Sequence, residues 1–600
     1  MTIPASTSLG SRRTIPLVFC SLLLAMGALA EAPAVGEQPG ALSPAGHAYP
    51  ALGAGADRKV DVAWNRFYDH AGLGDILARL HQAFPGLTRL YSIGKSTEGR
   101  DLWCIEVTAR GVGDPDRKPG MYVSGNIHGD EVQAGEMVAY TAWYLCHQYG
   151  RLDRVTTLLD NYVFYLVPTI NPDGRDFWLA TSTGAMSGRT GSTPIDNDRD
   201  GVADEDDCDD LDGDGTITMM RIKDPQGRYK KHPDYPAYLM VRAKPDEPGE
   251  YTLLGWEGLD NDGDGRVNED GRGGYDLNRN WARDWQPAYL QHGAMDYPFS
   301  QPETRAAARF VLAHPNIAAG QCYHNCGGMI LRGPGREGGE MKEADDRLLQ
   351  MIADRGEKIL PYYRSMISWQ DLYTTWGDED TWLYGARGIL AYTCEMWTAQ
   401  NLYKTDGDPS EEQEADFIRH VLQDDGVVAW HEFNHPTYGQ IEIGGMKKEW
   451  GRLPPSFLLE EELHRNMVFA LYHASMMPLL RIADVAVEPL ASRQFKLWVT
   501  IENSRPMPTR TGQDMDHHIS PPDLVSIEGN DLKVLSSGLV TDRFFKQVRA
   551  VESRPQRVEI DTIDGMDAAR VQFIVQGSGS FTVTVDSAKG GMLRKDGSLP

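Results

Sequence analysis

Between about Trp64 and about Ile482, short apolar runs alternate with segments that have helical spacing. Such runs are typical of buried strands, and helical spacing places apolar residues along one side of a helix. The strand-like runs are Met121 to Gly125, Tyr162 to Pro168, Ile317 to Tyr323 and Ile389 to Cys394. The helical segments are Glu131 to Tyr149, Glu303 to His314 and Lys342 to Leu360. The alternation predicts an α/β domain with a mixed, mostly parallel sheet flanked by helices.

The pattern changes at about Ala483, where runs of period two separated by turn residues begin. These runs are Gln494 to Ile501, Arg557 to Ile563 and Val571 to Val585. They predict a C-terminal all-β sandwich over residues 483–600, without a catalytic constellation, which we interpret as an accessory domain. We expect the α/β domain to span residues 61–482 and to end with a helix from Leu458 to Met477.

The N-terminus has the pattern of a secretory signal peptide. Arg12 and Arg13 precede an apolar run that ends in the small-residue pattern Ala28-Leu29-Ala30. We expect residues 1–30 to be a signal peptide, residues 31–60 to be a leader or linker, and the protein to be exported. A retained membrane span is the less favoured interpretation, and no other run is long enough to cross a bilayer. The arginine pair also permits the twin-arginine route.

The formal net charge of −27 argues against nucleic acid or anionic lipid as a partner, because both require a basic surface. Six cysteines remain once Cys20 leaves with the signal peptide. In an exported chain they are compatible with disulfides and equally with buried free thiols.

Candidate metal ligands follow two of the predicted strands. His128 and Glu131 come directly after Met121 to Gly125, and the carboxylate lies where a helix N-terminus favours negative charge. This spacing alone is not specific for metal ligands, since a capped turn would produce it too. His324, at the end of a second strand, offers a third ligand. Two histidines and one carboxylate leave one zinc position open for water, as catalytic sites do.

Glu395 ends a further apolar strand and is a candidate general base. Burial there would raise its pKa toward the range in which a carboxylate exchanges protons near neutral pH. The alternative is a buried carboxylate that serves only in an ion pair.

The order of these motifs resembles the zinc carboxypeptidases of the carboxypeptidase A and B type. The resemblance extends from about Trp64 to Gln400 and rests on five elements in the expected order. These are His128-x-x-Glu131, Asn171-Pro172-Asp173-Gly174, Asp276-Leu277-Asn278-Arg279-Asn280-Trp281, His324 and Glu395.

The resemblance implies a role for each matched residue. His128, Glu131 and His324 would bind zinc, and Glu395 would be the general acid/base. Asn278 and Arg279 would hold the free C-terminal carboxylate of a substrate, which suits the fork of a guanidinium.

The resemblance implies three further roles. Tyr373 matches a mobile tyrosine that closes over the substrate. Arg189 is the candidate for the arginine that polarises the scissile carbonyl, with Arg175 as the alternative. Asp380 falls in the segment of the specificity pocket, where an acid favours Lys or Arg termini. A shift of one residue would instead give Asp380 a structural role.

The implied activity is an exported zinc metallocarboxypeptidase acting on the C-termini of peptides or proteins. An amidase of cell-wall peptides or a deacylase of N-acyl amino acids would use the same residues. A non-catalytic, calcium-dependent adhesion protein would predict a damaged site, whereas all the expected ligands are present. The chain departs from digestive members of the family at Gly129-Asp130, where those enzymes carry a basic residue.

An acidic insertion over residues 175–275 carries three copies of a motif in which alternate aspartates precede a turn glycine. The same spacing opens an EF-hand loop, which wraps oxygen ligands around calcium. The alternative is a solvated acidic loop. None of the copies has a Glu at the twelfth position, and the first offers Asp207 there. The candidate calcium ligands are Asp196, Asp198, Asp200, Asp204, Asp207, Asp210, Asp212, Asp214, Asp260, Asp262 and Asp264.

Overall fold

The computed structural model describes residues 52–53, 58–180, 182–184, 188–339, 341–542, 544 and 546–600. The chain divides into two compact units, Met1–Ala56 and Asp57–Pro600, and every element below belongs to the second. The predicted signal peptide lies outside the described residues, so its assignment stays a prediction. Within the described part of the chain, no helix has both the length and the apolar character needed to cross a membrane.

An eight-stranded sheet forms the centre of the α/β region, in the order β1-β2-β4-β3-β9-β12-β10-β11. Its central strands β4, β3, β9 and β12 run parallel, whereas β1, β2 and β10 join by antiparallel pairing. The mixed, mostly parallel sheet is therefore confirmed. The strands are β1 Thr88–Lys95, β2 Asp101–Val107, β3 Gly120–Gly125, β4 Val163–Val167, β9 Ile317–Asn325, β10 Met329–Arg332, β11 Arg364–Ile367 and β12 Leu390–Met396.

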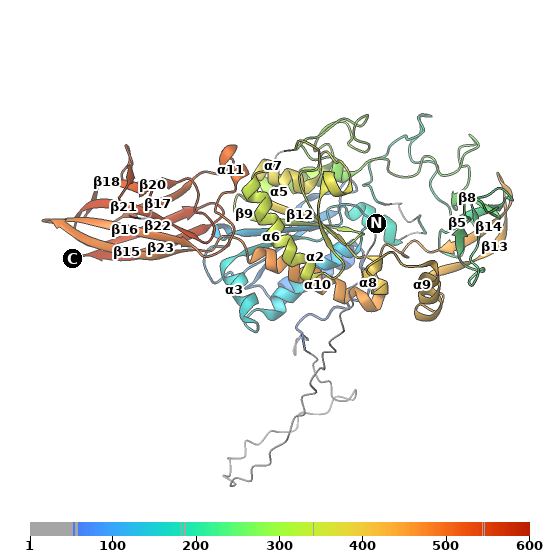
Figure 1. The fold of residues 1–600 in the computed structure, drawn as a ribbon, viewed down its shortest axis with the longest axis horizontal. Helices are drawn as coiled ribbons and strands as arrows, with labels where there is room; N and C mark the ends of the chain where they lie inside the picture. The colour runs from blue at the N-terminus through green and yellow to red at the C-terminus, as the bar shows by residue number, and fades with distance from the viewer. Residues whose placement is uncertain are drawn as a thin grey trace, which may run out of the picture. The chain divides into compact units, whose positions relative to one another are not determined.

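Helices cover both faces of this sheet (Figure 1). The α-helices of the described residues are α1 His70–Ala83, α2 Gln133–Gln148, α3 Asp153–Asn161, α4 Pro172–Ala180, α5 Pro302–Ala313, α6 Glu343–Ile359, α7 Glu379–Arg387, α8 Ala399–Tyr403, α9 Glu411–Asp416, α10 Ser456–Ala474 and α11 Gly512–Asp516. The long helices and buried strands predicted from the sequence agree with these bounds to within three residues at each end.

Side chains of β3 alternate between two covered faces of the sheet, which explains why most of its residues are apolar. Met121 and Val123 belong to one core cluster, with residues of α1, α2, α6 and α10, whereas Tyr122 belongs to a second cluster, with residues of α5 and α7. Successive strand residues point to opposite faces, and here both faces are covered. Polar side chains are thus tolerated mainly beyond the strand ends, which is where His128 and Glu131 lie.

The acidic insertion is not an isolated loop. A second sheet has six antiparallel strands in the order β13-β14-β5-β8-β6-β7 (Figure 1). Four of them belong to the insertion, and β13 and β14 form a hairpin that follows the α/β elements in the chain. The strands are β5 Met219–Lys223, β6 Tyr229–Lys231, β7 Met240–Arg242, β8 Tyr251–Trp256, β13 Val427–His435 and β14 Gly439–Met446. We call it the insertion sheet. Sequence analysis predicted no strands in this region.

The C-terminal region is built on antiparallel β-sheets, as predicted, and it also contains one short helix, α11. A five-stranded sheet, β15-β16-β21-β18-β19, and a four-stranded sheet, β20-β17-β22-β23, share one apolar core. The predicted run Val571 to Val585 divides between the two sheets, because the backbone turns at Gly577 and Gly579, both with positive φ. The strands are β15 Leu480–Ala491, β16 Gln494–Asn503, β17 Asp523–Glu528, β18 Leu532–Val540, β19 Val548–Ala550, β20 Arg557–Ile560, β21 Asp567–Gly577, β22 Gly579–Ser587 and β23 Gly591–Leu599.

Of the two possibilities left open by the sequence, free thiols are the one found for Cys104, Cys146, Cys322, Cys326 and Cys394, which form no disulfide among the described residues. Cys104, Cys146, Cys322 and Cys394 are buried in the core, where a thiol packs as a small apolar side chain.

Candidate metal centre

The three predicted metal ligands come from two neighbouring strand ends. His128 and Glu131 lie in the connection from β3 to α2, and His324 lies near the end of β9. Because β3 and β9 are adjacent and parallel, their carboxyl ends meet at the same edge of the sheet. All three side chains are buried.

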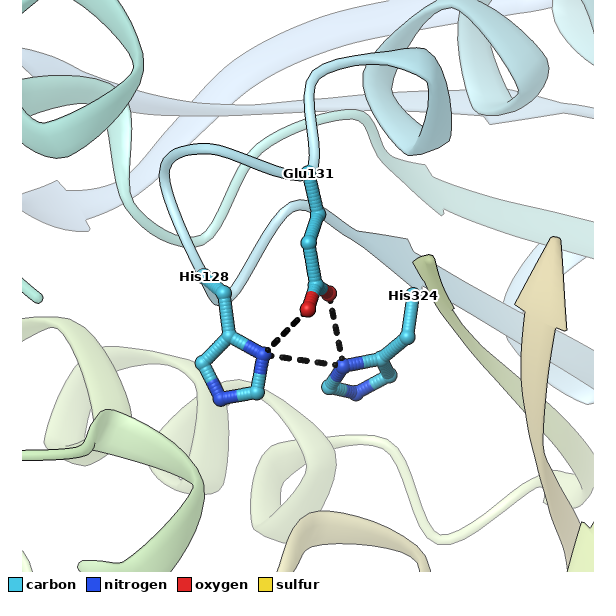
Figure 2. Close-up of side chains that lie close together, drawn as sticks. All are labelled: His128, Glu131 and His324. Carbon is cyan, nitrogen blue, oxygen red and sulfur yellow. Dashed lines mark hydrogen bonds and ion pairs between the residues drawn. The ribbon is translucent and has the colours of Figure 1, made fainter. Parts of the chain in front are cut away.

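Their ligand atoms converge on one point, and Figure 2 shows the three side chains directed toward one another. The Glu131 carboxylate lies 2.9 Å from Nδ1 of His128 and 2.9 Å from Nδ1 of His324. The two Nδ1 atoms are 3.2 Å apart.

This arrangement fits zinc. Two nitrogen ligands at ~2.0–2.1 Å from a tetrahedral zinc ion would lie about 3.3 Å from each other, close to the separation observed. The donor set of two nitrogens and one carboxylate is also that of catalytic zinc sites.

Asp276 orients the first histidine, a role that sequence analysis did not assign. Its Oδ1 lies 2.9 Å from Nε2 of His128. When Nδ1 binds a metal, the ring proton is on Nε2, which then donates a hydrogen bond to this carboxylate, and such a bond fixes the ring orientation.

Glu395 lies on β12 in register with His324 on β9, so the two side chains share one face of the sheet. Burial, followed by the nearby Glu131 carboxylate, raises the pKa of Glu395 to about 7. A cation held by Glu131 and the histidines would offset part of that repulsion. A carboxyl group in this range can both accept and return a proton near neutral pH.

Of the two arginine candidates, only Arg189 reaches the metal centre. Its guanidinium lies 3.1 Å from Oε1 of Glu131 and 3.5 Å from Oδ2 of Asp276, and its side chain keeps 26% exposure. Arg175 is fully buried and is paired instead with Glu136 and with backbone carbonyls of Tyr68 and Val132. The geometry therefore favours Arg189 over Arg175.

Asn278 and Arg279 lie in a short 3-10 turn, Leu277–Arg279, directly after Asp276. Arg279 donates a hydrogen bond of 3.4 Å to the hydroxyl of Tyr373, and the Asn278 side chain accepts one from the backbone of Glu379. The Tyr373 side chain is 53% exposed. The structure thus brings the three residues together.

Asp380 is buried at the start of α7 and accepts a hydrogen bond of 3.1 Å from the hydroxyl of Thr393. Thr393 precedes Glu395 by two residues on β12, so both point to the same face. Burial, followed by the neighbouring Asp378, raises the pKa of Asp380 well above its usual range.

The three acidic loops share one backbone turn. The first aspartate of each, Asp196, Asp210 or Asp260, accepts backbone N–H groups from the residues three and five positions on. The glycine at the sixth position has a positive φ in every copy, 105°, 89° and 95°, which accounts for the residue type.

The first and third loops also contact each other reciprocally. The Asp270 carboxylate accepts from the backbone N–H groups of Asn197 and Asp204, and the Asp206 carboxylate accepts from the backbone of Asn268 and the side chain of Asn261. These two buried aspartates were not predicted from the sequence, because their partners lie more than fifty residues away.

Several carboxylates of the loops lie close enough together to hold a cation. These groups are Asp198-Asp262-Asp264-Glu269, Asp198-Asp200-Glu205-Asp262, Asp196-Asp198-Asp270 and Asp210-Asp212-Glu257. Among the predicted ligands, Asp204, Asp207, Asp214 and Asp260 fall outside them. Glu205, Glu257, Glu269 and Asp270 were not predicted.

The fold and the site define a metal-binding α/β protein whose ligands stand at the carboxyl ends of parallel strands. Comparison with known sequences identifies the family. The pattern described as zinc carboxypeptidase matches residues 74–212 and 238–416, slightly more than half of the chain. The protein therefore belongs to the zinc carboxypeptidase family. A second pattern, described as a domain of unknown function, matches residues 479–597.

Individual relatives match over shorter stretches. Carboxypeptidase D of Drosophila melanogaster is 33% identical over 143 residues, which are 22% of this chain and 10% of that protein. Carboxypeptidase E of Caenorhabditis elegans is 30% identical over 158 residues, 26% of this chain and 34% of that protein. The matched region is thus at most about a third of either relative's length.

Solved structures are similar over more of the chain. Thrombin-activatable fibrinolysis inhibitor is 16% identical, with 70% of this chain and 76% of that chain covered and a TM-score of 0.43. Carboxypeptidase A from Helicoverpa armigera is 15% identical, with the same coverage and TM-score.

Proposed function

We propose that the protein is an exported zinc metallocarboxypeptidase that removes the C-terminal residue of peptides or proteins. The observation that carries the proposal is the convergence of His128, Glu131 and His324, with Glu395 in register beside His324. Family membership supports the same activity. Export is supported by the N-terminal sequence pattern alone.

Each side chain near the centre has a distinct chemical task. Zinc, when bound, acts as a Lewis acid that lowers the pKa of water toward neutrality. Glu395 accepts the proton of the attacking water and returns it to the departing amine. Arg189 donates hydrogen bonds to the scissile carbonyl oxygen as negative charge develops there.

Substrate recognition falls to the residues around Arg279. Its guanidinium and the Asn278 amide bind the free carboxylate of the substrate, and Tyr373 closes over it. Asp380 forms part of the pocket for the terminal side chain. Burial favours the neutral form of the Asp380 carboxyl group. A cationic side chain bound beside it would favour the ionised form, which supports Lys or Arg as the preferred terminal residue.

The sharpest test of this function compares a peptide that ends in a free carboxylate with the same peptide amidated. We expect amidation to reduce kcat/KM by about 10³-fold or more, because buried polar groups of the site would lose their partner. Peptides ending in Arg and in Leu, followed by mass spectrometry, would report cleavage and preference together.

The variant Arg279→Met supplies the matched control for this comparison. It should cleave the free peptide poorly and show little further loss on amidation. Equal cleavage of free and amidated peptides by the wild-type enzyme would refute carboxypeptidase activity and indicate an amidase or an endopeptidase.

We also propose that the acidic loops bind calcium. The support is the shared turn in all three loops and the reciprocal contacts of the first and third, which bring carboxylates from both around Asp198 and Asp262. Uncompensated carboxylates at this spacing repel one another, whereas hard divalent cations prefer such oxygen ligands.

Removal of calcium should lower the thermal stability of the protein and its activity without removing zinc. Calcium at a hundredfold excess over its dissociation constant would add about 2.7 kcal/mol per site to the free energy of unfolding. Thermal unfolding with and without calcium, with zinc content measured in the same samples, tests this. The double variant Asp198→Asn/Asp262→Asn should lose the calcium response, whereas Asp246→Asn, an exposed aspartate of the insertion, should keep it. A wild-type melting curve that calcium leaves unchanged would rule out the calcium sites.

A further inference from the structure

Arg452 lies outside both segments that match the family pattern, yet it contacts the metal centre. It belongs to the connection between β14 of the insertion sheet and α10. Its guanidinium donates a hydrogen bond of 3.1 Å to the backbone carbonyl of Asn325, and the Asn325 side chain donates one of 3.1 Å to the carbonyl of Arg452. Asn325 directly follows the ligand His324. The two hydrogen bonds form a closed pair that ties this connection to the end of β9.

The same guanidinium reaches the other half of the ligand set. It lies 3.4 Å from Oδ2 of Asp130 and 3.7 Å from Oε1 of Glu131. The Asp130 side chain is fully buried, and neither of its oxygens has a hydrogen-bond partner among the described residues. Arg452 is the one cation of the described chain within ion-pairing distance of Asp130. An unpaired carboxylate at this depth would be strongly unfavourable.

Packing beside Arg452 reinforces this contact. The next residue, Leu453, is buried in a small apolar cluster with Val132 and Trp178. Val132 directly follows Glu131. The connection therefore contacts the loop of the metal ligands at two points, through the Arg452 guanidinium and through the Leu453 side chain. Loops that carry function are commonly held by a rigid support of this kind.

We infer that Arg452 is a positioning residue that clamps the loop carrying His128 and Glu131 to the strand end carrying His324. One guanidinium joins the residue before Glu131 to the residue after His324, so it fixes the spacing between the two parts of the metal centre. The insertion sheet, through β14, is the element that presents it. This inference rests on the proposed zinc site and adds to it a support from outside the family-matched region.

The test measures metal release rather than turnover. In Arg452→Met, zinc should dissociate into a chelator about 10- to 100-fold faster than in wild type, the usual effect of losing a group that supports metal ligands. The absorption spectrum of the cobalt-substituted protein should change, because it reports the geometry of the ligands. Arg452→Lys should be intermediate, since it keeps a positive charge, but its shorter side chain cannot place that charge where Nη2 of Arg452 contacts both Asn325 and Asp130.

Two comparisons separate clamping from general destabilisation. Asp130→Asn combined with Arg452→Met should release zinc no faster than Arg452→Met alone, because both changes break the same contact. Arg481→Met, which removes an exposed arginine paired with Glu502 on the C-terminal domain, should behave as wild type.

The possible failures are distinguishable. A wild-type protein that binds no zinc would refute the proposed function and this inference together. Wild-type zinc binding with unchanged release and an unchanged cobalt spectrum in Arg452→Met would overturn the inference alone. Should Arg452→Met fail to fold, Asp130→Asn by itself must still speed zinc release and alter the cobalt spectrum for the clamp to stand.

Discussion

Replacing Glu395 with Gln should reduce kcat by about 10³-fold or more while zinc content stays at the wild-type level. General acid/base catalysis contributes about 10²- to 10⁴-fold, and Gln preserves the shape of the side chain while removing its ability to take up a proton. Glu395 is not among the metal-ligating side chains, so the metal should remain. Single-turnover kinetics and metal analysis of one preparation would measure both quantities.

The control for this substitution is Glu502→Gln. Glu502 lies in the C-terminal β region, and its carboxylate is paired with Arg481. Glu502→Gln should leave kcat unchanged. A Glu395→Gln enzyme that turns over at a near-normal rate would remove the assigned acid/base, and the water would then require a different proton acceptor.

Replacing His324 with Ala should abolish zinc binding and, with it, activity. The two remaining ligands, His128 and Glu131, lie on one loop, and β9 would no longer contribute a ligand to the metal. Loss of the metal also removes its contribution to stability, about 2.7 kcal/mol when zinc exceeds its dissociation constant a hundredfold. Metal analysis after dialysis and thermal unfolding with added zinc would report both effects.

His420→Ala is a suitable comparison, because His420 is exposed and far along the chain from the ligands. It should retain zinc and the zinc-dependent rise in melting temperature. Unchanged zinc content in His324→Ala would show that the ligand set proposed for this protein is incorrect.

Much of the metal centre was predictable from local patterns. His128 and Glu131 follow an apolar strand at a spacing that lets both reach one ion, and His324 and Glu395 end two further strands. Their common location follows from a general rule, since parallel strands present their carboxyl ends at one edge. Arg189 was preferred over Arg175 from sequence position, and the burial of Arg175 in a separate ion pair agrees with that choice.

Other parts of the site depend on contacts between distant segments, for which the sequence carries no local signal. Asp276 was part of a quoted motif, but its hydrogen bond to His128 spans 148 residues. The pairing of β14 with β5 joins the hairpin to the acidic insertion across a still longer separation, 221 residues between Arg221 and Glu442. Arg452 follows that hairpin in a connection without a recognisable pattern, so its contact with Asp130 could not be predicted.

For this protein, the sequence by itself determined the main elements of the α/β region and the β character of the C-terminal region, the candidate ligand residues and the repeated acidic turns, because periodicity and short-range hydrogen bonding depend on neighbours within a few positions. Only the tertiary structure decided which strands lie side by side, which face Glu395 shares with His324, and which cationic side chain lies beside the buried Asp130. Those outcomes depend on the packing of segments far apart in the chain, where many pairings are compatible with the same local pattern and burial selects among them.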